Sequence, residues 1–125
     1  MTSPAITPQE IQDAVDRVPR IRWSHLPTPL EDWTRLAARL GGPRILAKRE
    51  DLTGLAYGSN KGRHFEFEMA YAKNQGYNTL ININNFHSNQ ARFAAAACVR
   101  AGIRYVLVST GEVDRPLQGN LLLVK

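Results

Sequence analysis

Asp51-Leu-Thr-Gly-Leu-Ala-Tyr-Gly-Ser-Asn-Lys-Gly-Arg63 sets one lysine, Lys61, after a glycine-bearing turn and before a helical pattern that runs to about residue 74. A lysine amine attacks a carbonyl group only in its neutral form. The positive end of a helix dipole, together with Arg63 and His64, disfavours the ammonium form and favours an anionic ligand. Lys61 is therefore the candidate reactive residue, and a solvated lysine in a first helical turn is the alternative.

The segments around this stretch alternate between strand and helix patterns. Residues 45–48 form a short apolar run before the turn, and Gly76 is suited to end the helix that carries Lys61. The chain continues with a strand over 79–83, an alanine-rich helix over 90–101 and a strand over 103–108. This order predicts two consecutive βαβ units, which is an α/β fold with a parallel sheet and helices packed on it, βαβαβ.

Two polar loops follow predicted strands, the lysine loop (residues 51–60) and the second loop (residues 84–89). Ligands of parallel sheets bind beyond the carboxyl ends of the strands, where loops meet helix N-termini. Ser88, Asn89 and Gln90 bring a hydroxyl and two amides to such a helix start, although helix capping alone is the ordinary explanation for Ser and Asn there. Side by side, the two loops predict one pocket for an anion with Lys61 in it.

The sequence of the N-terminal third predicts two helices joined by an extended segment, here called the strap. Thr7-Pro-Gln-Glu10 carries a hydroxyl cap, a proline at the first helical position and a glutamate three residues after the cap, which predicts a helix to about residue 18. Prolines keep residues 21–30 extended. Residues 31–40 predict an amphipathic surface helix with Trp33, Leu36 and Leu40 on one face. The predicted organisation is this N-terminal part, 1–44, followed by a βαβ part, 45–125.

Composition narrows the classes of function. The 125 residues are 43% hydrophobic, enough for one core, and no apolar run approaches the length of a membrane span, so we expect a cytoplasmic protein. The net charge of +5 is spread along the chain, which argues against nucleic-acid binding. The three histidines and Cys98 lack metal-ligand spacing, Cys98 is expected to be a buried thiol, and the spacing around Lys61 does not fit a P-loop.

Several motifs in order resemble one known family. The stretch from Lys48 to Lys61, followed by Ser88-Asn-Gln-Ala-Arg92, closely resembles the 1-aminocyclopropane-1-carboxylate deaminase and D-cysteine desulfhydrase family. Leu26-Pro-Thr-Pro-Leu30 and Gly119-Asn-Leu-Leu-Leu123 resemble the segments that flank these motifs in the family. The resemblance therefore covers nearly the whole chain from residue 26 onward.

The resemblance implies a pyridoxal-phosphate enzyme of the tryptophan-synthase β-like fold that acts on a small amino acid. In that family the lysine matching Lys61 holds the cofactor covalently and takes up substrate protons, and the asparagine matching Asn60 precedes it at the cofactor. The serine matching Ser88 lies beside the substrate as the second catalytic residue. The asparagine matching Asn89 contacts the cofactor's ring oxygen, and Ser88, Asn89 and Gln90 together receive the substrate carboxylate. A homo-oligomer is implied for a full-length parent.

The sequence also departs from the family. Ser59 replaces a glycine of the turn, and the bulky residues Phe86 and His87 stand beside the substrate position, which predicts poor action on 1-aminocyclopropane-1-carboxylate. Family members continue past the segment that matches residues 119–123, so the chain is expected to be an N-terminal part that is inactive alone. Two hypotheses remain: a pyridoxal-phosphate lyase or deaminase, and a non-catalytic remnant or interaction module.

Overall fold

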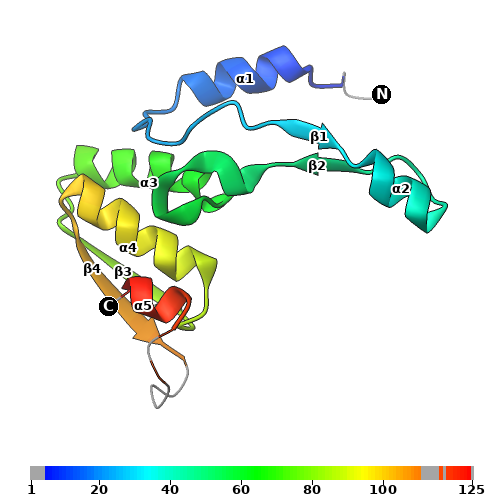
Figure 1. Cartoon of the computed structure of the whole chain (residues 1–125). Helices are drawn as coiled ribbons and strands as arrows, with labels where there is room; N and C mark the ends of the chain where they lie inside the picture. The colour runs from blue at the N-terminus through cyan, green and yellow to red at the C-terminus, as the bar shows by residue number, and fades with distance from the viewer. Residues whose placement is uncertain (1–4, 111–115, 117, 125) are drawn as a thin grey trace.

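The computed structural model describes residues 5–110, 116 and 118–124 (Figure 1). In chain order its elements are α1 (Pro8–Asp16), β1 (Leu30–Asp32), α2 (Thr34–Leu40), β2 (Leu46–Lys48), the 3₁₀ turns η1 (Glu50–Thr53) and η2 (Leu55–Tyr57), α3 (Lys61–Asn74), β3 (Thr79–Asn84), α4 (Asn89–Ala101), β4 (Arg104–Ser109) and α5 (Asn120–Val124). Among the described residues, no helix combines the length and the apolar character needed to cross a bilayer.

The core lies between α3, α4 and a parallel pair of strands. β3 and β4 run in register from Thr79 opposite Arg104 to Asn84 opposite Ser109, and α4 makes the crossover between them. Phe65 of α3 and Phe93 of α4 are fully buried and stack with ring centroids 5.8 Å apart. Eight buried residues make up this core: Trp23, Phe65, Met69, Phe93, Ala94, Ala97, Cys98 and Ile103. The predicted α/β fold with helices on a parallel sheet is confirmed.

The predicted first βαβ unit is wrong, because β2 does not join the parallel sheet. β2 pairs antiparallel with β1 in a separate two-stranded sheet, so the described residues contain one βαβ unit, β3–α4–β4. Ion pairs from residues that flank β2 reach β1 and favour this pairing: Arg49 binds Glu31, and Arg44 binds Asp32 at 2.7 Å. These contacts join residues far apart in sequence and leave no local signal in the apolar run at 45–48.

The helix predicted over 31–40 begins three residues late, at Thr34. Glu31 and Asp32, which fall inside the predicted helix, belong to β1 instead. Figure 1 shows α2 at the far end of the β1–β2 pair, away from α3 and α4. The face expected to pack is exposed to solvent, since Trp33 is 45% and Leu40 is 65% exposed.

The extended strap before β1 is anchored on α3 by one buried carboxylate. Glu66 accepts hydrogen bonds from the backbone N–H groups of Trp23 at 2.9 Å and Ser24 at 2.6 Å, and it forms an ion pair with Arg20. Burial alone would raise the pKa of Glu66, but these N–H groups and Arg20 lower it below its ordinary value. His25 adds a backbone bond to Thr53 at 3.0 Å, so the strap also touches the turn before Lys61.

Two further expectations are confirmed. The side chain of Thr7 accepts from the backbone N–H of Glu10, and the Glu10 carboxylate accepts from the backbone of Thr7, which is the predicted capping box of α1. Cys98 is fully buried, and burial raises the pKa of its thiol to about 11. The thiol is therefore a core group rather than a nucleophile.

Candidate functional site

The lysine loop has a backbone that only particular residues can follow. Ala56 and Tyr57 have φ values of 52° and 62°, in the left-handed region that side chains disfavour. Gly58 has φ 74°, and a Cβ atom there would lie 1.7 Å from the carbonyl oxygen of Asp51. Thr53 closes the loop, because its hydroxyl accepts from Ser59 N at 2.8 Å and donates to Ser59 O at 2.9 Å. The loop therefore reaches Lys61 with a fixed geometry.

Lys61 is the first residue of α3, as predicted, and is half-buried. Its backbone N–H donates to the hydroxyl of Ser59 at 3.1 Å, whereas the side chain of Asn60 makes no capping hydrogen bond. Ser59 thus performs the helix-capping role that the sequence analysis did not assign to it. The resemblance implied a glycine at position 59, and the serine found there caps α3 in this chain.

The basic side chains beside Lys61 already contact carboxylates. Arg63 donates to Glu50 at 2.7 and 2.8 Å and to the hydroxyl of Thr28 at 3.3 Å, and His64 lies 3.4 Å from Glu68. The hydrogen bond from Arg63 lowers the pKa of Glu50 to about 2 against the opposing effect of burial. The charge of Arg63, which the sequence analysis expected to act on Lys61, is therefore paired with the carboxylate of Glu50.

The second loop leads into α4 through the predicted cap. The Ser88 hydroxyl accepts from the backbone N–H of Gln90 at 3.1 Å, so α4 begins at Asn89, one residue before the predicted start. Within the loop, His87 N donates to Asn85 Oδ1 at 3.0 Å, and Ser88 N donates to the carbonyl of Asn85 at 3.2 Å. Ser88, Asn89 and Gln90 thus lie together at the N-terminus of α4.

Two residues that sequence reasoning left without a role orient Asn89. Its Oδ1 accepts from Arg92 Nη2 at 3.3 Å and from Asn120 Nδ2 at 3.0 Å, and Asn120 Nδ2 also donates to the carbonyl of His87 at 2.6 Å. Because both donors use the oxygen of the Asn89 amide, its Nδ2 is the end that can donate to a ligand. Arg92 and Asn120 both lie inside motifs of the family resemblance, which was the available signal for them.

Arg92 joins the two predicted loops. Its guanidinium donates to the carbonyl oxygens of Ala56 and of Gly58, the latter at 3.3 Å, and to Asn89 at the start of α4. The lysine loop and the N-terminus of α4 are therefore neighbours, as predicted. The predicted reason was wrong, because β2 is not part of the parallel sheet and a buried side chain makes the connection instead.

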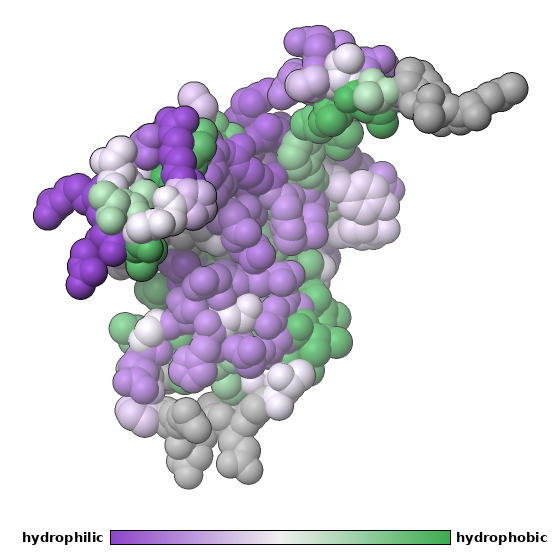
Figure 2. Space-filling view, turned by 90° about the vertical axis from the view of Figure 1, so that its right-hand side faces the viewer, coloured by the Kyte–Doolittle hydropathy of each residue, from purple (hydrophilic) through white to green (hydrophobic). Residues whose placement is uncertain are grey.

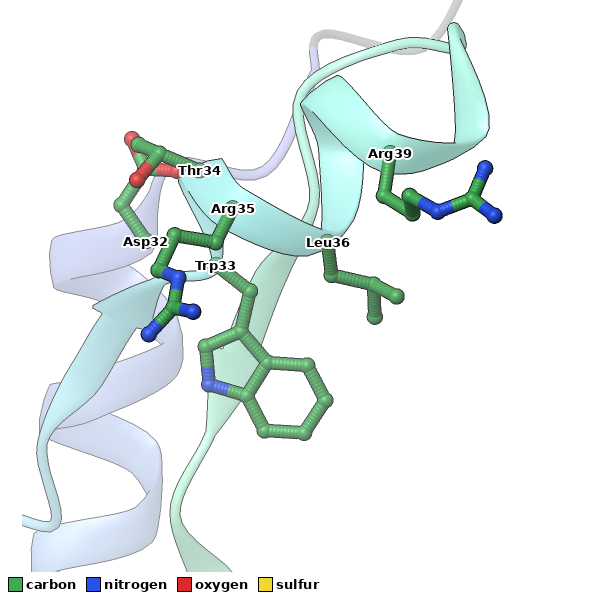
Figure 3. Close-up of a pocket in the computed structure, with 6 residues that line it drawn as sticks. All are labelled: Asp32, Trp33, Thr34, Arg35, Leu36 and Arg39. Atoms are coloured by element: carbon green, nitrogen blue, oxygen red, sulfur yellow. The ribbon is translucent and has the colours of Figure 1, made fainter.

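A hollow of about 680 Å³ lies elsewhere, at the junction of β1 and α2. Figure 3 shows Trp33 and Leu36 projecting toward the same side of this junction. Its six lining residues include neither Lys61 nor any residue of the second loop. We therefore assign the candidate site to the two loops joined by Arg92.

Known proteins resemble this chain over most of its length. The profile of one family, described as pyridoxal-phosphate dependent enzyme, matches residues 21–124. The chain belongs to this family. Pyridoxal phosphate is the family's cofactor, and the chemistry of the two loops suits it: a primary amine, a hydroxyl and an oriented amide donor at helix starts.

Curated members of the family with the name 1-aminocyclopropane-1-carboxylate deaminase are similar to the chain. The protein of Ralstonia pickettii is 41% identical over 102 residues, which are 80% of this chain and 30% of that protein. A probable deaminase of Cryptococcus neoformans is 38% identical over 116 residues, 87% of this chain and 34% of that protein.

A solved family structure supports the fold. The crystal structure of an ACC deaminase homologue superposes with a TM-score of 0.83 at 30% identity, covering 94% of this chain and 35% of that one. The chain thus spans about a third of the length of these family members.

Proposed function

We propose that this chain supplies the cofactor lysine and the substrate-carboxylate loop of a pyridoxal-phosphate-dependent lyase or deaminase that acts on a small amino acid. The relatives suggest one type, 1-aminocyclopropane-1-carboxylate deaminase. The resemblance of the sequence motifs adds D-cysteine desulfhydrase as the second type. The main support is the joining of the two loops: Arg92 binds both the approach to Lys61 and Asn89, which follows Ser88.

Each site residue has a role that suits its chemistry. Lys61 is the covalent attachment point and later accepts a substrate proton, with Asn60 beside it at the cofactor. Asn89 donates from Nδ2 to the ring oxygen of the cofactor. Ser88 and Gln90 bind the substrate carboxylate at the positive end of α4. When bound, pyridoxal phosphate would supply the electron sink for the reaction.

The second loop suggests that the substrate differs from that of the named relatives. Phe86 is half-buried and His87 is exposed beside the start of α4, where we propose that the substrate carboxylate binds. Their bulk reduces the room for a cyclopropane ring. We therefore propose an amino-acid substrate other than 1-aminocyclopropane-1-carboxylate for the whole enzyme, with D-cysteine as the first alternative to assay.

Reaction of Lys61 with the cofactor tests the proposal. Purified chain is incubated with pyridoxal phosphate, reduced with borohydride and mapped by peptide mass spectrometry. We expect the label to concentrate on Lys61 relative to the exposed Lys73, and a Lys61→Arg variant to lose that label while Lys73 stays labelled at the same level. Equal labelling of all lysines, with Lys61 no higher than Lys73, would contradict the proposal and favour a non-catalytic interaction module.

A further inference from the structure

We propose that Arg92 is a positioning residue whose guanidinium sets the lysine loop and the N-terminus of α4 in one fixed arrangement. The geometric part concerns the described residues alone. Only the step from this arrangement to capture of the cofactor by Lys61 rests on the proposed function.

The contacts of Arg92 converge from two segments. Nη1 donates to the carbonyl of Ala56, and Nη2 donates to the carbonyl of Gly58 and to Asn89 Oδ1, both at 3.3 Å. Arg92 itself is 8% exposed. Ala56 and Gly58 precede Lys61 by five and three residues, so a shift of either carbonyl moves the start of α3. One side chain therefore couples the position of Lys61 to that of Asn89.

The hydrogen-bond partners of Arg92 differ from those of Arg20 and Arg63, two other arginines that bind other segments of the chain. Arg20 and Arg63 each bind a carboxylate, whereas the described partners of Arg92 are two carbonyls and one amide oxygen. Its Nε is buried without a hydrogen-bond partner among the described residues. Among the described residues these partners are all neutral, and hydrogen bonds to neutral groups offset the cost of burying a cation less than a paired carboxylate does. Such a group is suited to fixing a particular geometry rather than to adding stability.

The lysine loop needs such a constraint. Ala56 and Tyr57 are consecutive left-handed residues, a conformation that persists only where the surroundings enforce it. The hydrogen bonds from Arg92 fall on the carbonyls of Ala56 and Gly58, which flank Tyr57. Without them the loop would relax toward ordinary backbone angles, and the backbone at Lys61 would no longer be held relative to Asn89.

Two measurements on the full 125-residue chain test the proposal in Arg92→Gln and Arg92→Lys variants. Hydrogen–deuterium exchange of the peptide that covers the lysine loop reports the geometry without any cofactor. Borohydride-trapped labelling by pyridoxal phosphate, as the ratio of Lys61 to Lys73, reports its consequence. Arg100→Gln is the matched control, because Arg100 lies on the same helix and is exposed.

We expect Arg92→Gln to speed exchange in the lysine loop and to lower the labelling ratio, each on the order of tenfold, the effect of losing one hydrogen bond to a charged group. Arg92→Lys should recover part of both, since an ammonium reaches fewer of the three acceptors, and Arg100→Gln should change neither. Partial recovery of slow exchange and of the labelling ratio in Arg92→Lys would show that Arg92 positions the loop, because a variant that had lost its fold would recover neither.

Unchanged exchange in the lysine loop of a folded Arg92→Gln variant, judged by circular dichroism, would overturn the proposal. If Arg92→Gln does not fold, Arg92→Lys decides: exchange and labelling equal to those of Arg100→Gln would also overturn it. Failure of the proposed function has a different signature, in which the wild-type chain shows no preference for Lys61 while exchange in the lysine loop still responds to Arg92→Gln.

Discussion

Gly58 has the most restricted backbone position of the lysine loop, and we predict that Gly58→Ala destabilises the chain by about 2 to 4 kcal/mol. A Cβ atom there would lie 1.7 Å from the carbonyl oxygen of Asp51, and the backbone at φ 74° disfavours any side chain. Thermal or denaturant unfolding followed by circular dichroism measures the loss.

Gly42→Ala is the matched control, because a Cβ atom at Gly42 meets nothing within 4 Å and its φ is not positive. We expect that variant to stay within about 0.5 kcal/mol of the wild-type free energy of unfolding. Equal stabilities for Gly58→Ala and Gly42→Ala would show that the lysine loop can accommodate a side chain at position 58. The claim that the backbone before Lys61 has a fixed geometry would then be refuted.

At the scale of elements, the Glu50–Arg63 ion pair links η1 to α3 and makes the connection sensitive to acid. Arg63 lowers the pKa of Glu50 from 4.5 to about 2 in the folded chain. A carboxylate with a lowered pKa stabilises the fold fully above its unfolded pKa and loses that contribution as the pH falls toward its folded pKa. We predict that stability falls between about pH 4.5 and pH 2 and that Glu50→Gln removes part of this fall.

Melting temperatures of the wild-type chain and of Glu50→Gln at a series of pH values provide the measurement. Glu10, Asp51 and Glu66 also have lowered pKa values and contribute to acid sensitivity in both chains. The informative quantity is therefore the difference in melting temperature between the wild-type chain and Glu50→Gln. This difference should be largest near neutral pH and shrink toward pH 2. A difference that is constant with pH would rule out the ion pair as its source.

Elements with a local signal could be predicted, and those fixed by distant partners could not. α3 and α4 carry apolar faces, glycine stops and a serine cap, and both were predicted to within a residue. β1 and β2 are three residues each and pair with one another across a gap in the sequence, with ion pairs that join Glu31 to Arg49 and Asp32 to Arg44. Acidic residues at 31 and 32 are typical of a first helical turn, which favoured a helix there. In the structure they belong to β1 and form ion pairs with Arg49 and Arg44.

The candidate site divides in the same way. Lys61 and Ser88 lie at helix starts. Turn residues and capping residues in the sequence indicate these starts, so the position of both residues at a helix N-terminus could be predicted. Arg92 and Asn120 act through carbonyls and an amide contributed by other segments. Side chains whose partners are backbone atoms leave no complementary residue in the sequence, which is why their contacts had to come from the structure.

At the scale of the whole molecule, one face of the parallel sheet is apolar and exposed. Ile81 pairs with Val106 and Ile83 pairs with Val108, and these side chains are between 39% and 70% exposed. The side of the molecule drawn in Figure 2 is mostly hydrophilic, with smaller hydrophobic areas, so the apolar character of the sheet face rests on the exposed Ile and Val side chains. Exposed apolar sheet faces and open strand edges promote association. We predict that the isolated chain self-associates through this face.

Light scattering of the wild-type chain and of an Ile83→Lys, Val108→Lys double variant tests this prediction. We expect the double variant to be smaller in solution with an unchanged circular dichroism spectrum. Val99→Lys is the control, because Val99 is 82% exposed on α4, away from the sheet face, and should leave the size unchanged. A wild-type chain that is already monomeric would disprove the prediction.

The contacts of Asn120 bear on the order in which the site assembles during synthesis. Ribosomes make chains from the N-terminus, so structure can form on early residues before later ones exist. Among the described residues, the hydrogen bonds from the Arg92 guanidinium go to positions that precede it in the chain, whereas His87 and Asn89 also accept hydrogen bonds from the amide of Asn120. The lysine side of the site can therefore be set on the nascent chain first, and the second loop acquires its full set of contacts only when residue 120 has been made.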